Sequence, residues 1–445
     1  MKDNETSLLS HDLATFAMSE NLPDDVLGFA SRALKNALAC AHAASQASSM
    51  QSMAHMAVRN SSGADIPLVG QDATADPLWA SWYNAAAANA LDYDDTHIPS
   101  ILHPTSCVAG AVLSAAITEG RNGNDLLGAL AMGMEVACRL AHVISPQHYA
   151  AGWHITATCG VFGAAAGAGR LMHLDARQME WAFGGAMSRA SGFVSTLGTA
   201  SKLLGVGGAA RDGLLAAMLA AEGFDGPENP LGCRFGFLHV MGAADRISEL
   251  TSDLGTRWHM LDTALKPYPC GVVLNPVIDA ALLLRTRVGS DLDSIASIQV
   301  SGARLLKDRT DRPGVTTGNM AQVSAQHAVA VALTDGQATP AEFTDAMTAR
   351  PDVQSIGAKV SVMVDDTHSV NGARIDVEMA DGTFFSETVE HARGSLARPL
   401  GDADIDAKMR LCCTNPAEAE ALIDACDGLQ NAADLGALLA AMRRP

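Results

Sequence analysis

The chain has few aromatic side chains and few lysines. Phe, Trp and Tyr make up 4% of the residues, and there are seven lysines against 23 arginines. The acidic residues outnumber the basic ones, and the net charge is −19. A nucleic-acid-binding surface needs clustered cations to neutralise phosphates, so this balance argues against nucleic acid as a partner. Abundant Ala and Gly with few aromatics predict closely packed helices that meet through small side chains.

Several common sequence motifs are also missing. The nine cysteines are odd in number and form no CxxC pair, which argues against a disulfide framework and a zinc motif. No GxxxxGK[ST] loop is present, and no GxGxxG follows a predicted strand. The polar stretch 1–20 has no apolar segment of a secretion signal, and the longest apolar run, 156–169, is broken by glycines. We expect a cytoplasmic protein without a metal or organic cofactor and without a membrane partner.

The first part of the chain is predicted to be helical. Pro23 followed by Asp24 and Asp25 is typical of a helix start, because proline fits the first turn and the carboxylates complement the helix dipole. Apolar residues recur at helical spacing in six segments. These are 24–47, 79–91, 104–119, 124–143, 155–171 and 175–187.

The pattern changes after residue 264. Three segments, 298–300, 359–364 and 374–379, alternate polar and apolar residues as half-buried strands do. Asp381-Gly382 predicts a hairpin turn before a fourth strand, and helices are expected at 273–286 and 322–334. The tail, 402–442, is again helical in pattern. We therefore predict a mainly α fold. Both chain ends, 1–263 and 396–445, form a large all-helical domain with an inserted α+β lid domain at 264–395.

Two of the seven lysines stand in apolar surroundings rich in glycine or proline. Lys202 lies in a segment with glycines at 198, 205, 207 and 208, and Lys266 precedes Pro-Tyr-Pro-Cys-Gly. An ammonium group in such a place costs several kcal/mol unless it meets an anion. An acidic chain that keeps both is expected to use them on a small anionic ligand. The alternative is an extended surface side chain or a structural ion pair.

A first candidate site is the segment from Asp92 to His103. Three carboxylates and two histidines within twelve residues suit an acid/base group, in which an aspartate fixes the tautomer of His103. The residues alone leave open which of the three aspartates does this. In the alternative, Asp94, Asp95 and Thr96 close one helix and cap the next. The spacing matches no familiar zinc pattern.

A second candidate is His154, at the start of a helix rich in Gly and Ala. A helix start binds carboxylates well and favours a neutral imidazole, which suits a proton acceptor. A satisfied core or capping histidine is the alternative. Tyr149, five residues earlier, could donate its hydroxyl to a substrate or pack at an interface.

Taken in order, these segments resemble the MmgE/PrpD family, which includes 2-methylcitrate dehydratase, cis-aconitate decarboxylase and iminodisuccinate epimerase activities. The resemblance covers about residues 10–335. It rests on Leu13-Ala-Thr-Phe16, Leu22-Pro23, Asp92 to Thr96, His103-Pro104, Gly152-Trp-His154, Lys202 with Gly205, Ala209 to Leu214, Gly223 to Pro227, Lys266 to Cys270 and Ser324 to Ala330.

The resemblance implies a homodimer and a pocket built from particular residues. The implied catalytic set is His103, His154, Asp92, Lys202 and Lys266, in which Asp92 would orient a histidine. The implied substrate-binding set is Thr96, Tyr149, Tyr268 and His327. It also implies no metal and no organic cofactor.

Three positions depart from the family pattern. Asn275 precedes Pro276 where many members have histidine, and His327 stands where members often have tyrosine. Gly271, which has no side chain, stands near the position at which the decarboxylases carry a histidine. These changes argue against decarboxylation of the itaconate-forming type and leave the exact reaction open.

We therefore predict a cofactor-independent lyase or isomerase that removes a proton next to a carboxylate of a small di- or tricarboxylate. Dehydration, as in 2-methylcitrate dehydratase, is the first expectation. The alternatives are epimerisation of an aspartate-derived dicarboxylate and a carboxylate-binding protein without turnover.

Overall fold

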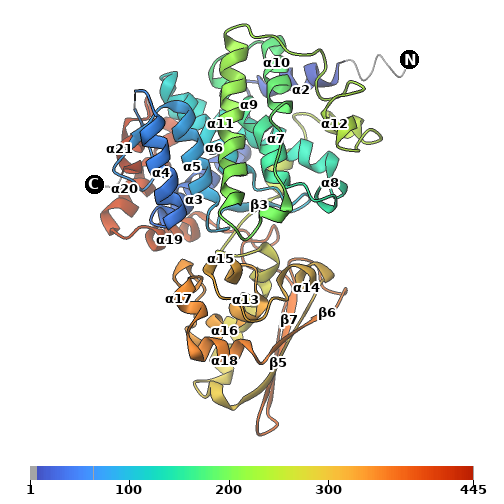
Figure 1. Cartoon of the computed structure of the whole chain (residues 1–445), viewed down its shortest axis with the longest axis vertical. Coiled ribbons are helices and arrows are strands. Elements are labelled where there is room, and N and C mark those ends of the chain that lie inside the picture. Colours follow the sequence, from blue (N-terminus) through green and yellow to red (C-terminus); the bar gives the residue numbers. More distant parts are fainter. Residues whose placement is uncertain (1–7, 64, 444–445) are drawn as a thin grey trace. The chain divides into compact units, whose positions relative to one another are not determined.

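The computed structural model describes residues 8–63 and 65–443 and divides into two units (Figure 1). The first unit contains residues up to 90, residues 94–263 and residues from 402 onward; the second contains residues 91–93 and 264–401. The expected mainly α fold is confirmed. The second unit ends at Gly401 rather than at 395, and it also takes in Leu91 to Tyr93.

The first unit is built almost entirely from helices. Those before the insertion are α2 (Leu9–Ala17), α3 (Asp24–Ala44), α4 (Ser48–Asn60), α5 (Pro77–Asn89), α6 (Pro104–Thr118), α7 (Gly123–Ile144), α8 (Gln147–Ala150), α9 (Ile155–Leu171), α10 (Ala176–Met187), α11 (Ser201–Ala221) and α12 (Phe237–Val240). The chain end adds α19 (Asp402–Cys412), α20 (Pro416–Asp427) and α21 (Gly436–Met442). Short strands are β1 (Ile66–Pro67), β2 (Thr74–Ala75) and β3 (Asp95–His97).

Helix α9 lies at the centre of this unit and packs against α6, α7 and α11 (Figure 1). Its small residues allow this close approach. A Cβ on Gly163 would lie 2.5 Å from the Gly133 carbonyl oxygen, and one on Gly167 would lie 2.9 Å from that of Ala129. The run of Ala and Gly at 164–169 is therefore helical packing surface, as the composition indicated.

The helix starts follow their sequence signals. Helix α10 begins after a capping box, in which Asp175 accepts from the Gln178 backbone and Gln178 accepts from the Asp175 backbone. Helices α5 and α6 both begin at a proline. Helices α7 and α11 are long and apolar enough to cross a membrane by length and composition. Their most apolar windows are 94% and 61% buried in the structure, and core helices pass the same test.

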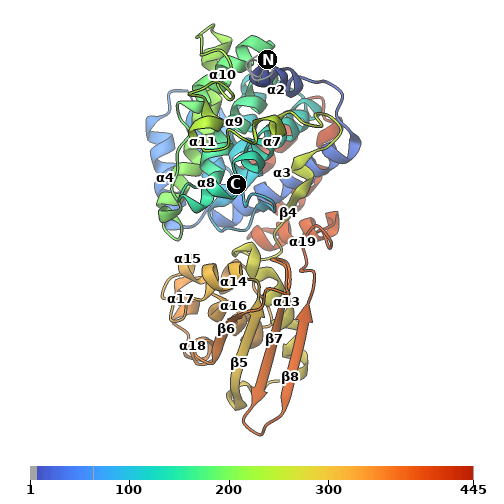
Figure 2. The ribbon, with the colours of Figure 1, turned by 90° about the vertical axis from the view of Figure 1, so that its right-hand side faces the viewer.

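The second unit combines a four-stranded sheet with helices on one of its faces (Figures 1 and 2). The sheet order is β6 (Val360–Val364), β5 (Ile295–Gly302), β7 (Ala373–Met379) and β8 (Phe384–Val389). The helices are α13 (Asn275–Val288), α14 (Arg304–Thr310), α15 (Gly318–Ala321), α16 (Ala325–Thr334), α17 (Asp345–Thr348) and α18 (Pro351–Gly357). Strand β4 (Thr263–Leu265) leads the chain into this unit.

The register of this sheet follows the alternation in the sequence. In β7 the side chains of Ala373, Ile375 and Val377 are fully buried, while the residues between them are not. Strands β7 and β8 form the expected hairpin, and Gly382 in the turn has a φ of 87°, which favours glycine. Helices α13 and α16 pack against each other and contact strands of the sheet.

Candidate functional site

In the first unit, His103 is paired with a buried carboxylate. His103 is the N-cap residue of α6, and its Nδ1 lies 3.1 Å from Oδ1 of Asp94. The Asp94 side chain is fully buried, and the His103 side chain is 12% exposed. An imidazole with one nitrogen held by a buried carboxylate has a fixed tautomer and can exchange a proton through the other.

A network of buried amides holds Asp94 in place. Asn89 Nδ2 donates to Asp94 Oδ2 at 2.7 Å, and Asn36 Nδ2 donates to the Asp94 carbonyl at 2.8 Å. Lys408 Nζ in turn donates to Asn36 Oδ1 at 2.7 Å. Burial lowers the pKa of Lys408. These contacts tie the segment before β3 to α3, α5 and α19, so the carboxylate cannot turn away from His103.

The sequence analysis assigned the orienting role to Asp92, and that assignment stays a prediction. The hydrogen bond to the His103 ring comes from Asp94. The capping alternative for Asp94, Asp95 and Thr96 is wrong. Helix α5 ends at Asn89, and the N-cap residue of α6 is His103. Asp95 is fully buried and accepts the hydroxyl of Thr105 through a short hydrogen bond.

Three helix starts gather beside His103. The backbone N–H of His103 donates to Thr156 Oγ1 in the first turn of α9 at 3.1 Å. Cys107 is the fourth residue of α6, and its sulfur contacts the carbonyl oxygens of Thr156 and Val206. A Cβ on Gly205 of α11 would lie 3.3 Å from the Ala157 side chain. The starts of α6, α9 and α11 are therefore neighbours, and their dipoles favour an anion there.

His154 and Lys202 belong to the same helix starts. His154 is the N-cap residue of α9, is 4% exposed, and donates its backbone N–H to the Gly192 carbonyl at 3.1 Å. Lys202 is half-buried in the first turn of α11. Burial raises the pKa of the Cys107 thiol, and the charge of Lys202 acts against that rise, which places the ammonium in the field of the α6 start.

Two further candidates, Thr96 and Tyr149, also belong to the first unit. Thr96 is 2% exposed, and its hydroxyl donates to the Asp95 carbonyl at 2.8 Å. Tyr149 is half-buried in the short helix α8. Substrate binding by these two residues stays a prediction.

In the second unit, Lys266 and Asp92 form a buried ion pair. Lys266 Nζ lies 3.2 Å from Asp92 Oδ2 and donates to the Asp92 carbonyl at 3.1 Å. Lys266 is 1% exposed and the Asp92 side chain 17%. Asp92 has a φ of 50°, in the left-handed region that few non-glycine residues adopt. Strained backbone of this kind is concentrated at functional sites.

Tyr268 and His327 are engaged inside this unit. The Tyr268 hydroxyl donates to Asp279 Oδ1 at 2.6 Å, and burial with that carboxylate raises the pKa of the phenol. Nε2 of His327 lies 2.7 Å from the Glu342 carbonyl, and burial lowers the pKa of the imidazole. The hydrogen bonds of both side chains support packing of the second unit, and their contact with substrate stays a prediction.

The candidates therefore divide between the units. His103, His154, Lys202, Thr96 and Tyr149 belong to the first, and Asp92, Lys266, Tyr268 and His327 to the second. The use of both Lys202 and Lys266 on one ligand stays a prediction. The residues that sequence reasoning missed are Asp94, Thr156 and the Asn36–Lys408 pair. The scarcity of lysines is the sequence signal that could have pointed to Lys408.

Comparison with known proteins gives a consistent family assignment. The model of the MmgE/PrpD N-terminal domain matches residues 11–250, and that of the MmgE/PrpD C-terminal domain matches residues 268–429. A cis-aconitate decarboxylase of Aspergillus terreus is 26% identical over 100% of this chain and 97% of its own length. Those of Mus musculus and Homo sapiens are 26% and 25% identical, over 83% of this chain and 79% and 80% of their own lengths. With both domain models matched over most of its length, the chain belongs to the MmgE/PrpD family.

Proposed function

We propose that this protein is a lyase that acts on a small tricarboxylate and begins by removing a proton next to a carboxylate. The observation that carries the proposal is the pairing of His103 with the buried Asp94 beside three helix starts. The names of the curated relatives support it, because a cis-aconitate decarboxylase is a lyase whose substrate is a tricarboxylate.

In the proposed mechanism, Nδ1–H of His103 donates a hydrogen bond to Asp94 and keeps its proton, which leaves the lone pair on Nε2. That nitrogen takes the proton from the carbon next to a substrate carboxylate. The electron pair of the broken C–H bond moves toward the carboxylate oxygens. The helix starts of α6, α9 and α11, together with Lys202, stabilise the negative charge that develops. His154 is the proposed acid for the leaving group, and no metal or organic cofactor takes part.

Dehydration is the first candidate for the second half of the reaction. The carbanion's electron pair forms a C=C bond as the β-hydroxyl leaves and takes a proton from the acid, so that one water is released. Two departures from the family pattern, both in the second unit, argue against decarboxylation without choosing among the other reactions. Gly271 has no imidazole ring, although the space would admit a side chain. A Cβ built on Gly271 would lie 4.0 Å from its nearest neighbour, the Gln322 carbonyl oxygen. Asn275, where many members have histidine, is 3% exposed and accepts weakly from Cys270.

Decarboxylation of cis-aconitate is the second candidate, and the names of the relatives favour it. In that reaction the C–C bond to one carboxylate breaks, CO2 leaves, and the carbanion takes a proton from His103 or His154. Both candidates use the same imidazole pair and the same anion-stabilising helix starts. They differ in the bond that breaks and in the product.

A substrate panel followed by proton and carbon NMR separates these reactions. Citrate, 2-methylcitrate, malate, cis-aconitate and an aspartate-derived dicarboxylate are each incubated with the purified protein in deuterated water. Dehydration converts a hydroxy acid to an alkene without loss of carbon, whereas decarboxylation releases CO2 from cis-aconitate. Epimerisation gives deuterium exchange and the opposite stereoisomer of an aspartate-derived acid without elimination. A carboxylate-binding protein without turnover shifts ligand signals and forms no product, which would overturn the proposal.

The control variants are His103→Gln and His55→Gln. His55 lies on the exposed face of α4, so its replacement tests the effect of losing an exposed histidine that belongs to none of these helix starts. The proposal expects product from the wild-type protein and from His55→Gln at similar rates. It expects a loss of roughly 10²–10⁴-fold in His103→Gln, the usual contribution of acid/base catalysis.

A further inference from the structure

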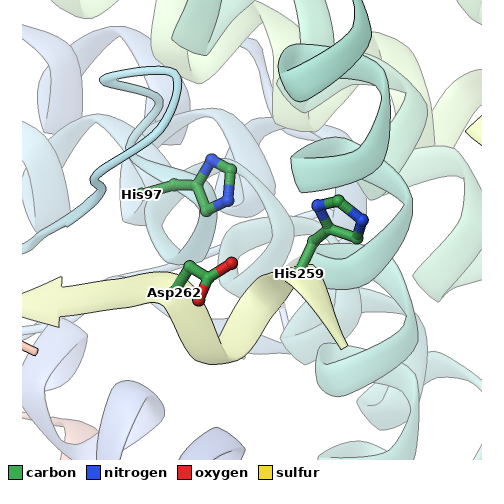
Figure 3. Close-up of side chains that lie close together, drawn as sticks. All are labelled: His97, His259 and Asp262. Atoms are coloured by element: carbon green, nitrogen blue, oxygen red, sulfur yellow. The ribbon is translucent and has the colours of Figure 1, made fainter. Parts of the chain in front are cut away.

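We propose that His97, His259 and Asp262 form a structural site for a divalent transition metal, with zinc as the best fit. Each of these residues offers a ligand atom, and the three atoms lie within 4.8 Å of one another. Figure 3 shows both imidazole rings and the carboxylate turned toward a common space. All three belong to the first unit, and none of them is used in the proposed reaction.

The local backbone explains why these side chains meet. His97 ends β3, while His259 and Asp262 are the first and last residues of a 3₁₀ helix, η3 (His259–Asp262). A 3₁₀ helix has three residues per turn, so residues three apart share one face. The N–H of Ile98 donates to the Asp262 carbonyl at 3.1 Å, which joins the two segments directly.

His97 has the features of a prepared metal ligand. Its side chain is fully buried, and Nδ1 lies 2.7 Å from the hydroxyl oxygen of Ser100. Within the described chain, Nε2 has no hydrogen-bond partner. A metal-binding histidine commonly has its second nitrogen held in this way, because the contact fixes the ring and its tautomer. An imidazole buried with an unsatisfied nitrogen is costly without a ligand.

His259 presents the second unsatisfied nitrogen. It is 7% exposed, and its Nδ1 lacks a hydrogen-bond partner among the residues that the structure describes. A divalent ion held between the two rings would satisfy Nε2 of His97 and Nδ1 of His259 together.

Two neighbours compete with a metal. Arg257 Nη2 lies 2.5 Å from Asp262 Oδ2, so the carboxylate must share its charge with a guanidinium. The His259 backbone also interacts with the His97 ring. A purely structural cluster would leave the nitrogens of His97 and His259 unsatisfied, whereas a metal would satisfy both. Asp262 would bind through one oxygen and keep Arg257 on the other.

The ligand set and its spacing fit zinc. Two imidazoles and a carboxylate with one open position are ligands that zinc accepts. With bonds of about 2.0–2.1 Å in tetrahedral geometry, ligand atoms lie about 3.3 Å apart, so small side-chain rotations would bring the three into place. The Asp262 side chain is 23% exposed, which leaves a path for the ion and a position for water. The His142 ring, with its centroid 4.8 Å from that of His259, is the other possible fourth ligand.

The site is tested with metal alone on the full chain. The protein is stripped with a chelator and titrated with cobalt(II), whose visible absorption reports tetrahedral nitrogen and oxygen ligands, and with zinc in a calorimeter. Variants are His97→Gln, His259→Gln and Ser100→Ala, with His55→Gln as the matched control. Circular dichroism confirms that each variant is folded.

The expected result is one metal ion per chain and a cobalt spectrum in the wild-type protein and in His55→Gln. His97→Gln and His259→Gln should lose the spectrum. Ser100→Ala, which keeps all three ligands but removes the contact to Nδ1, should bind zinc about 10–100-fold more weakly. The proposal is overturned if the wild-type protein gives no cobalt spectrum, or if the two histidine variants bind metal as well as it does. If either histidine variant fails to fold, the Ser100→Ala affinity decides, and an unchanged value overturns the proposal. The reaction assay is independent of this test.

Discussion

Asp94 is held from both sides, with Oδ1 3.1 Å from His103 Nδ1 and Oδ2 2.7 Å from Asn89 Nδ2. Asp94→Asn keeps the shape of the side chain but replaces a carboxylate by an amide, which can donate to Nδ1 and select the wrong tautomer of His103. We expect kcat to fall by roughly 10²–10⁴ with a small change in KM. Steady-state kinetics on the substrate identified by NMR provides the measurement.

The matched control for this variant is Asp125→Asn, at an exposed position in the first turn of α7. It removes one carboxylate from the same unit and should leave kcat unchanged. Equal kcat values in Asp94→Asn and the wild-type protein would show that Asp94 is a structural residue only.

Lys202 is predicted to bind a substrate carboxylate at the start of α11. Because it is half-buried and lies in a first turn, Lys202→Met should fold normally but raise KM by roughly 10-fold or more, the loss of one charge-assisted hydrogen bond. Lys307→Met, at a half-buried position in α14, is the control and should leave KM unchanged. A KM for Lys202→Met within twofold of the wild-type value would remove Lys202 from the binding site.

Lys266 has a structural role that can be measured apart from any substrate. Its ammonium makes two contacts with Asp92, and the side chain is almost completely buried. Lys266→Met should lower the free energy of unfolding of the second unit by about 1.5–3 kcal/mol, because a charged hydrogen-bond acceptor loses its partner. Denaturant unfolding followed by hydrogen exchange on the second unit checks this. Unchanged protection there would mean that the pair contributes nothing to stability.

His148 makes the stability of the first unit sensitive to acid. Its ring stacks on Trp153, and neither ring nitrogen has a hydrogen-bond partner in the described part of the chain. Burial lowers the pKa to about 4 from the usual 6.5. The unfolded chain therefore takes up this proton first as the pH falls. The contribution of the neutral His148 ring to the free energy of unfolding is therefore complete above pH 6.5. It declines between pH 6.5 and 4, by up to about 1.4 kcal/mol per pH unit.

The comparison that isolates this effect is His148→Phe, which keeps a ring beside Trp153 but cannot titrate. Unfolding is measured from pH 7.5 to pH 4 for both proteins, with His55→Gln as an exposed-histidine control. We expect the wild-type protein and the control to lose stability relative to His148→Phe below pH 6.5. Parallel curves for all three would contradict the assignment.

Helix starts and strand alternation could be predicted because their signals are local. The helix start at Asp24, the start at Pro104 and the Asp381-Gly382 turn each depend on residues a few positions away, and the structure confirms all three. The end of the second unit could not be placed in the same way. The stretch between β8 and α19 has no regular pattern, so its membership depends on packing.

The roles of neighbouring carboxylates were beyond sequence reasoning. Asp92 has left-handed backbone, and β3 begins only at Asp95, so neither Asp92 nor Asp94 follows a regular pattern. In the structure Asp92 pairs with Lys266, Asp94 with His103, and Asp95 with Thr105. The cluster of His97 with His259 was hidden for another reason. It joins residues that are far apart in the chain, and only the fold brings them together.

The central claim is that Nε2 of His103 removes the proton from the carbon next to a substrate carboxylate. The most direct measurement is the rate of deuterium incorporation at that carbon in deuterated water, followed by proton NMR for the wild-type protein, His103→Gln and His154→Gln. The account predicts exchange in the wild-type protein and a loss of at least roughly 100-fold in His103→Gln. Exchange in His103→Gln at close to the wild-type rate, with exchange abolished in His154→Gln, would contradict it.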